Sequence, residues 1–148
     1  MGTPNTGYFG GGLNPAKSTV DRIDYSNDTA TAAVKGPLSS VRYSLAAISN
    51  NSFGYFGGGT TPTVSTVDRI DYLNDTATAV PKGPLSVTRR NLAATGNASF
   101  GYFGGGEPGT KSSVDRLDYS NDTATAAAKG KLFISRGYLA EKDNHWFG

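Results

Sequence analysis

A repeated hexapeptide sets the strongest constraint on what this chain can fold into. The string Gly-Tyr-Phe-Gly-Gly-Gly begins at Gly7, Gly54 and Gly101, so successive copies are 47 residues apart. The surrounding sequence repeats with it, which divides a single domain over residues 1–148 into copies at 7–53, 54–100 and 101–147. Periods of about 20 to 50 residues are typical of architectures in which each unit buries its apolar face against the next unit.

Each copy contains four short segments that alternate in the manner of β-strands. In the first copy they are Ser18–Tyr25, Thr29–Val34 and Ser44–Ser49, followed by the run from Asn51 that includes the next hexapeptide. Each segment is bounded by Gly, Pro, Asn or Asp residues of the kind that form turns. No apolar stripe with helical spacing is visible. The pattern therefore predicts an all-β fold, a β-propeller with three four-stranded blades in the chain.

These motifs resemble those of a known repeat family. A glycine triplet that closes one strand, the strand VDRIDY (Val20–Tyr25) and a basic residue before the next apolar strand resemble the kelch-type β-propeller repeat. The chain has TATAAVKGPL where kelch repeats have a tryptophan, so the repeat is kelch-like. The tandem string STVDRIDYSNDTATA is also similar to repeats in predicted structural or tail-associated proteins of marine cyanobacterial phages. That resemblance implies a structural role in a virion or a place in the host cytoplasm.

The kelch-like strand order makes a prediction about assembly. It places Ser44–Ser49 nearest the ring axis, followed outward by the hexapeptide strand, Ser18–Tyr25 and Thr29–Val34. The chain would then begin at a second strand with no inner strand before it, and would finish in the inner-strand segment Gly137–Asp143. Closed propellers have about 4 to 8 blades. We therefore expect a homodimer that closes a six-bladed ring by strand exchange at the termini, or a piece of a longer propeller.

Composition and charge exclude several classes of function. The net charge is +2, and the 14 basic residues are spread along the chain, so no nucleic-acid footprint is expected. Cysteine is absent and His145 is the only histidine, which excludes thiolate and histidine-cluster metal sites. There is no secretory signal pattern and no apolar run of roughly 20 residues. We expect a soluble chain with no membrane partner and no cofactor.

Catalytic motifs are also weak. The string GGGEPGTKS comes close to a phosphate-binding loop, but Thr110 separates Gly109 from Lys111. Asp21 and Asp24 fall on opposite faces of a strand, which disfavours calcium, and Arg22 is expected to pair with Asp24 or with a neighbouring blade. Every acidic residue in the strands is repeated, whereas catalysis needs carboxylates in unique positions. The sequence therefore predicts that the protein is not an enzyme.

Binding remains, and it points to the loops. The copies differ most at 13–17, 60–64 and 107–111, and around 39–44, 86–91 and 133–138, which this topology places at one end of the ring. Arg42, Arg89 and Arg136 recur there, either as an anion-binding ring or as donors to loop carbonyls or to an aspartate of an adjacent blade. The candidate ligand-binding residues are Arg42, Tyr43, Arg89, Arg90, Arg136, Tyr138, Lys17 and Lys111. We expect a scaffold or protein-interaction module, with a lectin-like, carbohydrate-binding propeller as the alternative.

Overall fold

The computed structural model describes residues 2, 3 and 5–140 of the chain. Its strands form three four-stranded antiparallel sheets, which confirms the predicted all-β class. The first sheet contains β1 (Gly2–Thr3), β2 (Thr6–Gly10), β3 (Val20–Asp24) and β4 (Ala33–Lys35). The second contains β5 (Ala46–Ser49), β6 (Phe53–Gly57), β7 (Val67–Asp71) and β8 (Val80–Pro81). The third contains β9 (Ala93–Gly96), β10 (Phe100–Gly104), β11 (Ser113–Asp118) and β12 (Ala127–Lys131).

The remaining regular structure in the described part of the chain is three single turns of 3₁₀ helix, one after the third strand of each sheet. They are η1 (Tyr25–Asn27), η2 (Tyr72–Asn74) and η3 (Tyr119–Asn121). An aspartate precedes each turn and caps it; in the first, Asp24 accepts a hydrogen bond from the backbone N–H of Ser26 at 2.9 Å. Within the described part of the chain, no helix is long and apolar enough to cross a membrane.

The repeat fixes the same strand register in every sheet. Tyr8 lies opposite Arg22 in the first sheet, and Tyr55 lies opposite Arg69 in the second. Tyr102 opposite Arg116 completes the series in the third sheet. Because side chains alternate between the two faces of a strand, this shared register places equivalent residues on equivalent faces of all three sheets.

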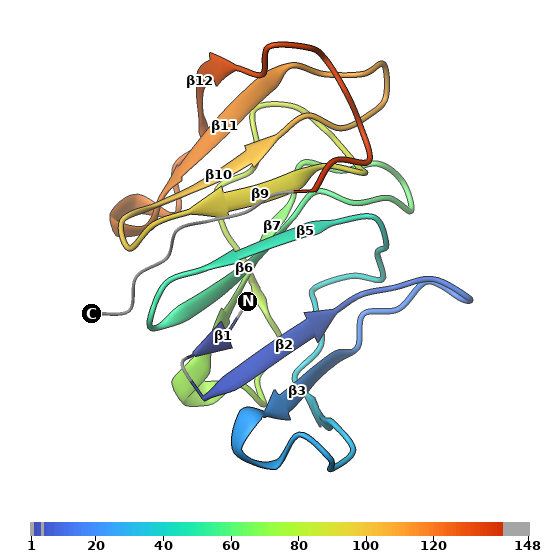
Figure 1. The fold of residues 1–148 in the computed structure, drawn as a ribbon, viewed down its shortest axis with the longest axis vertical. Coiled ribbons are helices and arrows are strands. Elements are labelled where there is room, and N and C mark those ends of the chain that lie inside the picture. Colours follow the sequence, from blue (N-terminus) through green and yellow to red (C-terminus); the bar gives the residue numbers. More distant parts are fainter. Residues whose placement is uncertain (1, 4, 141–148) are drawn as a thin grey trace.

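The three sheets spread apart like the segments of a fan (Figure 1). In this view the third sheet runs upward from β9 to β12, and the first sheet runs downward from β2 to β3. In the second sheet, β7 lies behind β5 and β6. The inner strands meet near the middle, where β5 contacts β9. This arrangement is consistent with three neighbouring blades of a β-propeller.

The apolar core lies between neighbouring sheets. One cluster joins the first and second sheets through Tyr8, Val20 and Phe56, and a larger one joins the second and third through Tyr55 and Phe103. The adjacent residues Tyr55 and Phe56 of β6 therefore pack in opposite directions, because side chains alternate between the two faces of a strand. The middle sheet is covered on both faces, whereas the first and third sheets each have one face that no described sheet covers.

The inner edge of the first sheet differs from the sequence-based expectation. We expected no strand before the hexapeptide strand, and this was wrong because β1 pairs Gly2 with Gly7 and Thr3 with Thr6. The Thr3 side chain accepts a hydrogen bond from the Thr6 N–H at 3.1 Å, which stabilises this tight turn. However, the described residues of β1 pair with only two residues of β2, whereas β5 runs alongside β6 from Ser49 to Ala46.

The outer strands also begin later than the sequence suggested. Thr29–Val34 was expected to form a strand, but β4 starts only at Ala33. The 3₁₀ turn ends just before this segment, and the hydrogen bond from the Ala30 N–H to the Asn27 carbonyl holds the first residues of the segment in a turn. The expected inner strand at Gly137–Asp143 lies partly outside the described residues, and Gly137–Ala140 form no strand.

Candidate functional site

The variable loops gather at one end of the sheets. In each sheet, the loop between the second and third strands is bonded to the segment that leaves the outer strand. Arg42 N–H donates to the Lys17 carbonyl at 2.9 Å, and Arg89 N–H donates to the Val64 carbonyl at 3.1 Å. Arg136 N–H makes the same contact with Lys111 at 3.0 Å. This confirms that the two sets of loops share one end, which we call the loop face.

Backbone hydrogen bonds also join the loops of neighbouring sheets. Asn91 N–H donates to the Ser44 carbonyl at 2.9 Å, and Tyr138 N–H donates to the Asn91 carbonyl at 2.8 Å. All three residues have left-handed backbone angles, with φ between 52° and 58°. The loop face is therefore a connected surface in which each sheet holds the next, rather than a set of independent loops.

The second glycine of each triplet shapes this face. Gly58 has φ of +68°, and a Cβ added there would lie 2.4 Å from the carbonyl oxygen of Arg89. A side chain would therefore be excluded both by the backbone angle and by the approach of the arginine segment. The triplet therefore forms a turn with close backbone approach, not a phosphate loop.

The first two repeated arginines are structural. Arg42 and Arg89 are only 1% and 0% exposed. Arg42 Nη2 lies 2.6 Å from Asp68 Oδ2, and its Nη1 donates to the Gly58 and Thr66 carbonyls at 3.0 and 3.1 Å. These partners match one of the two alternatives drawn from the sequence, donation to loop carbonyls and to an aspartate of the next sheet.

Burial dominates the electrostatics of these arginines. It lowers the pKa of the Arg42 guanidinium, and the Asp68 carboxylate acts in the opposite direction. Asp68 is itself fully buried and also accepts from the Ser39 backbone N–H at 2.9 Å. Arg89 repeats the arrangement with Asp115 at 3.3 Å. Neither guanidinium is available to a ligand from solvent.

The other candidate residues are distributed unevenly. Tyr43 and Arg90 are half-buried and join neighbouring sheets, Tyr43 through a backbone bridge to Thr60 and Arg90 through an ion pair with Glu107 at 3.5 Å. The Lys111 amine donates to the Pro108 carbonyl at 2.9 Å. The exposed candidates are Lys17, Arg136 and Tyr138. The loop face therefore offers cationic and aromatic groups, but not a ring of equivalent arginines.

A second set of aspartates is buried between the sheets, and the sequence analysis did not predict this. Asp75 accepts hydrogen bonds from the Tyr8 hydroxyl at 2.9 Å and from Arg22 Nη1 at 2.7 Å, and Lys35 lies 3.3 Å away. All three donors come from the first sheet, so Asp75 is a hub between two sheets. Asp122 occupies the same position against Tyr55, Arg69 and Lys82. Arg22 therefore pairs with the neighbouring sheet rather than with Asp24.

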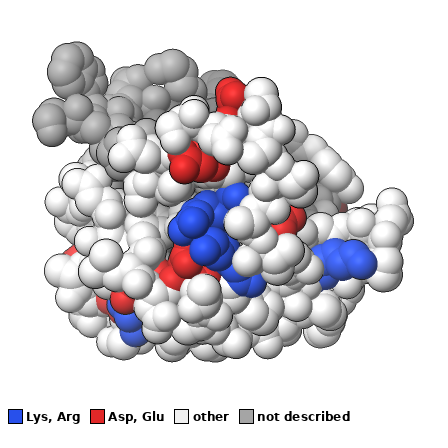
Figure 2. All heavy atoms as spheres, turned by 90° about the horizontal axis from the view of Figure 1, so that it is seen from below, with Lys and Arg blue, Asp and Glu red and all other residues white. Residues whose placement is uncertain are grey.

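The surface of the molecule at the end where the first sheet lies carries charges of both signs (Figure 2). Figure 2 looks at the end where the first sheet lies and shows basic atoms near the middle of this side, bordered by acidic atoms. Among residues 2, 3 and 5–140, no group of three or more His, Cys, Asp or Glu side chains could hold a metal ion. The buried carboxylates of Asp68, Asp75, Asp115 and Asp122 form ion pairs between sheets, and Asp24, Asp71 and Asp118 cap the 3₁₀ turns.

We expect Asp75 to make the stability of the protein depend on pH. Burial acts to raise its pKa, but hydrogen bonds from Tyr8 and Lys35 and the charge of Arg22 outweigh it, so the pKa is lowered. Its contribution to stability is therefore present above the unfolded pKa of about 3.9 and is lost as pH falls through the lower folded value. The Asp75→Asn variant should be less stable than wild type at pH 7, and the difference should shrink below about pH 4. Urea unfolding from pH 7 to pH 2.5 tests this; a constant difference would contradict it.

A scan against protein-family models finds no match for the chain, and a search of curated proteins finds no relative.

Proposed function

We propose that the protein is a non-enzymatic interaction scaffold that binds a partner through its loop face. The observation that carries this proposal is that conserved and variable positions of the repeat have different roles: the charged residues common to the repeats join the sheets, and the variable residues lie in loops. Asp68, Arg42 and Asp75 form ion pairs between sheets. The sequence varies instead in the loops, which backbone hydrogen bonds hold in a connected surface. Variable loops on a rigid frame are the usual location of a recognition site.

We also propose that the sheets are blades of a kelch-like propeller that two chains close into a six-bladed ring. The fan in Figure 1 supports this, because the first and third sheets run in opposite directions from the middle. Three further blades would complete the circle on the open side. The inner edge of β2 beyond β1 also borders a cavity of about 350 Å³, lined by Gly10, Ala47 and Phe56 among others. In the second sheet the corresponding edge is occupied by β5, so this cavity suits an inner strand from a partner chain.

A phage structural component is the setting that we propose for such a scaffold. It rests on the similarity of the repeated string STVDRIDYSNDTATA to repeats of phage structural and tail-associated proteins. A ring with many equivalent positions suits a particle that is itself built from repeated parts.

The alternative is a carbohydrate-binding propeller, and one observation favours it. Two equivalent small cavities, of about 160 and 180 Å³, lie beside the third strands of the second and third sheets. Arg69, Asp71 and Asn74 line the first, and Arg116, Asp118 and Asn121 line the second. Equivalent polar sites of this kind could bind several sugars of one glycan, and weak sites gain from such multivalency.

Single-site labelling separates the two functions, since the chain has no cysteine of its own. A photo-crosslinker on Thr110→Cys would lie on the loop face, and one on Leu73→Cys would lie at the opposite end of the sheets. The scaffold predicts one discrete protein adduct from Thr110→Cys alone, competed by unlabelled chain, in extracts of the organism that encodes the protein. Equal labelling from both positions, or none, would contradict it.

A glycan array supplies the other arm. Saturable sugar binding that Asn74→Ala or Asn121→Ala weakens would support the lectin and replace the scaffold as the proposed function.

A further inference from the structure

The packing of one aromatic residue defines the contact between neighbouring sheets. The Phe56 ring lies directly over Gly10 of the first sheet, where an added Cβ would be 2.8 Å from the ring. Phe103 lies over Gly57 in the same way, with a corresponding distance of 2.6 Å. The surrounding side chains are Tyr8, Val20 and Leu38 in the first contact and Tyr55, Val67 and Leu85 in the second. Each contact thus needs a glycine on one sheet and a phenylalanine on the next.

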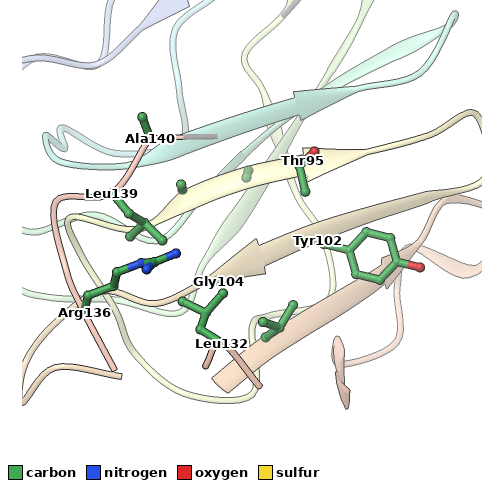
Figure 3. A pocket seen from close by; sticks show the side chains of 10 residues that line it. Thr95, Tyr102, Gly104, Leu132, Arg136, Leu139 and Ala140 are labelled. Atoms are coloured by element: carbon green, nitrogen blue, oxygen red, sulfur yellow. The ribbon is translucent and has the colours of Figure 1, made fainter. Parts of the chain in front are cut away.

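The third sheet has the glycine without the phenylalanine. Among the described residues, an added Cβ on Gly104 would meet only Val114 at 3.4 Å and Leu132 at 3.9 Å. These residues, with Tyr102, line an open cavity of about 160 Å³ (Figure 3). Tyr102 lies at one end of it, and Arg136 and Leu139 lie at the other. The lining repeats the tyrosine, valine and leucine that surround Phe56 and Phe103.

The first sheet has the phenylalanine without the glycine. Phe9 is 65% exposed, whereas Phe56 and Phe103 are 3% and 0% exposed. No described sheet covers the face of the first sheet on which Phe9 lies. Both equivalents of Phe9 are buried against a neighbouring sheet, so the exposure of Phe9 marks a face that lacks such a neighbour within the described residues.

The donors and the acceptor of the Asp75-type cluster are separated between the same two faces. Within the described residues, Tyr102, Arg116 and Lys129 form no hydrogen bond or ion pair with a carboxylate, although their equivalents surround Asp75 and Asp122. Asp28 stands at the position of those two aspartates in the first sheet and is exposed. The third sheet therefore presents the donors, and the first sheet presents the matching acceptor.

The glycine at the end of the outer-strand segment also indicates a missing neighbour beside the third sheet. A Cβ added to Gly36 or Gly83 would lie 1.9 or 1.8 Å from an alanine carbonyl oxygen of the next sheet. Gly130 is their equivalent in the third sheet, and a Cβ there would meet no atom of residues 2, 3 and 5–140 within 4 Å. The alanine that would complete this contact is Ala30, which is exposed in the first sheet. Within one chain, the close approach that excludes a side chain at Gly36 and Gly83 is missing at Gly130.

We propose that the free face of the third sheet binds the free face of the first sheet of a second copy of this chain. Phe9 of one copy fills the cavity over Gly104 of the other, and Asp28 accepts from Tyr102, Arg116 and Lys129. The occupant is a second copy because one segment carries all the required groups at the required spacing. Phe9, Asp28 and Ala30 are spaced as Phe56, Asp75 and Ala77 are in the contact within the chain. The charges are complementary across the contact.

This inference rests on the proposed two-chain ring and assigns the residues that close it. Gly104→Ala tests it with little expected effect on the fold, since its Cβ would make ordinary contacts inside one chain. In the dimer the same methyl group would collide with Phe9. Overpacking of this kind should raise the dimer dissociation constant by about 10- to 100-fold. Sedimentation measures the mass, about twice 15.4 kDa for the wild-type dimer, while thermal unfolding checks the fold; Lys17→Glu, on the loop face, is the matched surface control.

A charge exchange gives a second, independent readout. Asp28→Arg alone and Arg116→Glu alone should each be monomers, because both contacts of each ring would set like charges against each other. A mixture of the two variants should form dimers again. In the mixed ring, one contact pairs the two introduced side chains, with their charges in reversed order, and the other contact is the wild-type pair. Only a direct contact between these positions of two copies predicts recovery on mixing.

The outcomes separate this inference from the proposed ring. A wild-type dimer that loses mass in Gly104→Ala and regains it in the mixed charge variants supports both. A wild-type dimer that neither Gly104→Ala nor the charge variants affect overturns the residue assignment, while the proposed six-bladed ring still stands. A series of higher oligomers that these substitutions dissolve supports the contact and overturns the six-bladed closure. A wild-type monomer at all concentrations overturns both, and leaves binding through the loop face to its own crosslinking test.

Discussion

Replacing Asp68 by asparagine is expected to lower the free energy of unfolding by about 3 to 5 kcal/mol. Asp68 is fully buried, and its carboxylate neutralises the equally buried Arg42 at 2.6 Å. Asparagine has nearly the same shape, but it would leave the guanidinium charge uncompensated away from water. Small domains have total stabilities of about 5 to 15 kcal/mol, so one substitution would remove a large share. Urea unfolding monitored by tyrosine or tryptophan fluorescence measures the change.

A double-mutant cycle provides the control for this prediction. Arg42→Met should also destabilise, because the Gly58 and Thr66 carbonyls would lose their buried donor. The Arg42→Met/Asp68→Asn chain should cost clearly less than the sum of the two single variants, since no unpaired charge remains. If the two effects add, Arg42 and Asp68 do not act as a pair and the structural role assigned to Arg42 is wrong.

The sheets could be predicted because local patterns determine them. Alternation, turn residues and the 47-residue period specify where strands lie and how equivalent residues face. Prediction failed where a few hydrogen bonds decide the outcome. The cap at Asp24 and the turn after it delay β4, and a threonine side chain allows the two-residue β1 to form. These are small local energies that strand patterning does not reveal.

The environment of each candidate site residue could not be predicted from the repeat alone. Arg89 and Arg136 stand at the same place in their copies, yet the first is buried and the second is exposed. The difference is the neighbouring sheet, which brings the Asp115 carboxylate to the Arg89 guanidinium. Equivalent sequence therefore gives equivalent local structure, while burial and charge pairing depend on what each face meets.

The same dependence on the neighbouring sheet underlies the other large effect that we expect. Phe103→Ala should lower the free energy of unfolding by about 3 to 5 kcal/mol, because it removes a fully buried ring and leaves a cavity over Gly57. Phe9→Ala changes the same residue type at the same position of the repeat, but in the first sheet the ring is exposed. In the monomer it should change stability by no more than about 0.5 kcal/mol.

Comparing these two variants measures what a neighbouring sheet contributes. Urea unfolding should be performed at protein concentrations where the transition midpoint no longer depends on concentration, so that only contacts within one chain count. Equal losses of stability in Phe103→Ala and Phe9→Ala would mean that each phenylalanine is stabilised within its own sheet. Such a result would contradict a contribution from the neighbouring sheet. In dilute solution, Phe103→Ala should lose much more unfolding free energy than Phe9→Ala. If this difference narrows as the protein concentration rises, Phe9 is acquiring the environment of Phe103, since association stabilises the folded chain by mass action.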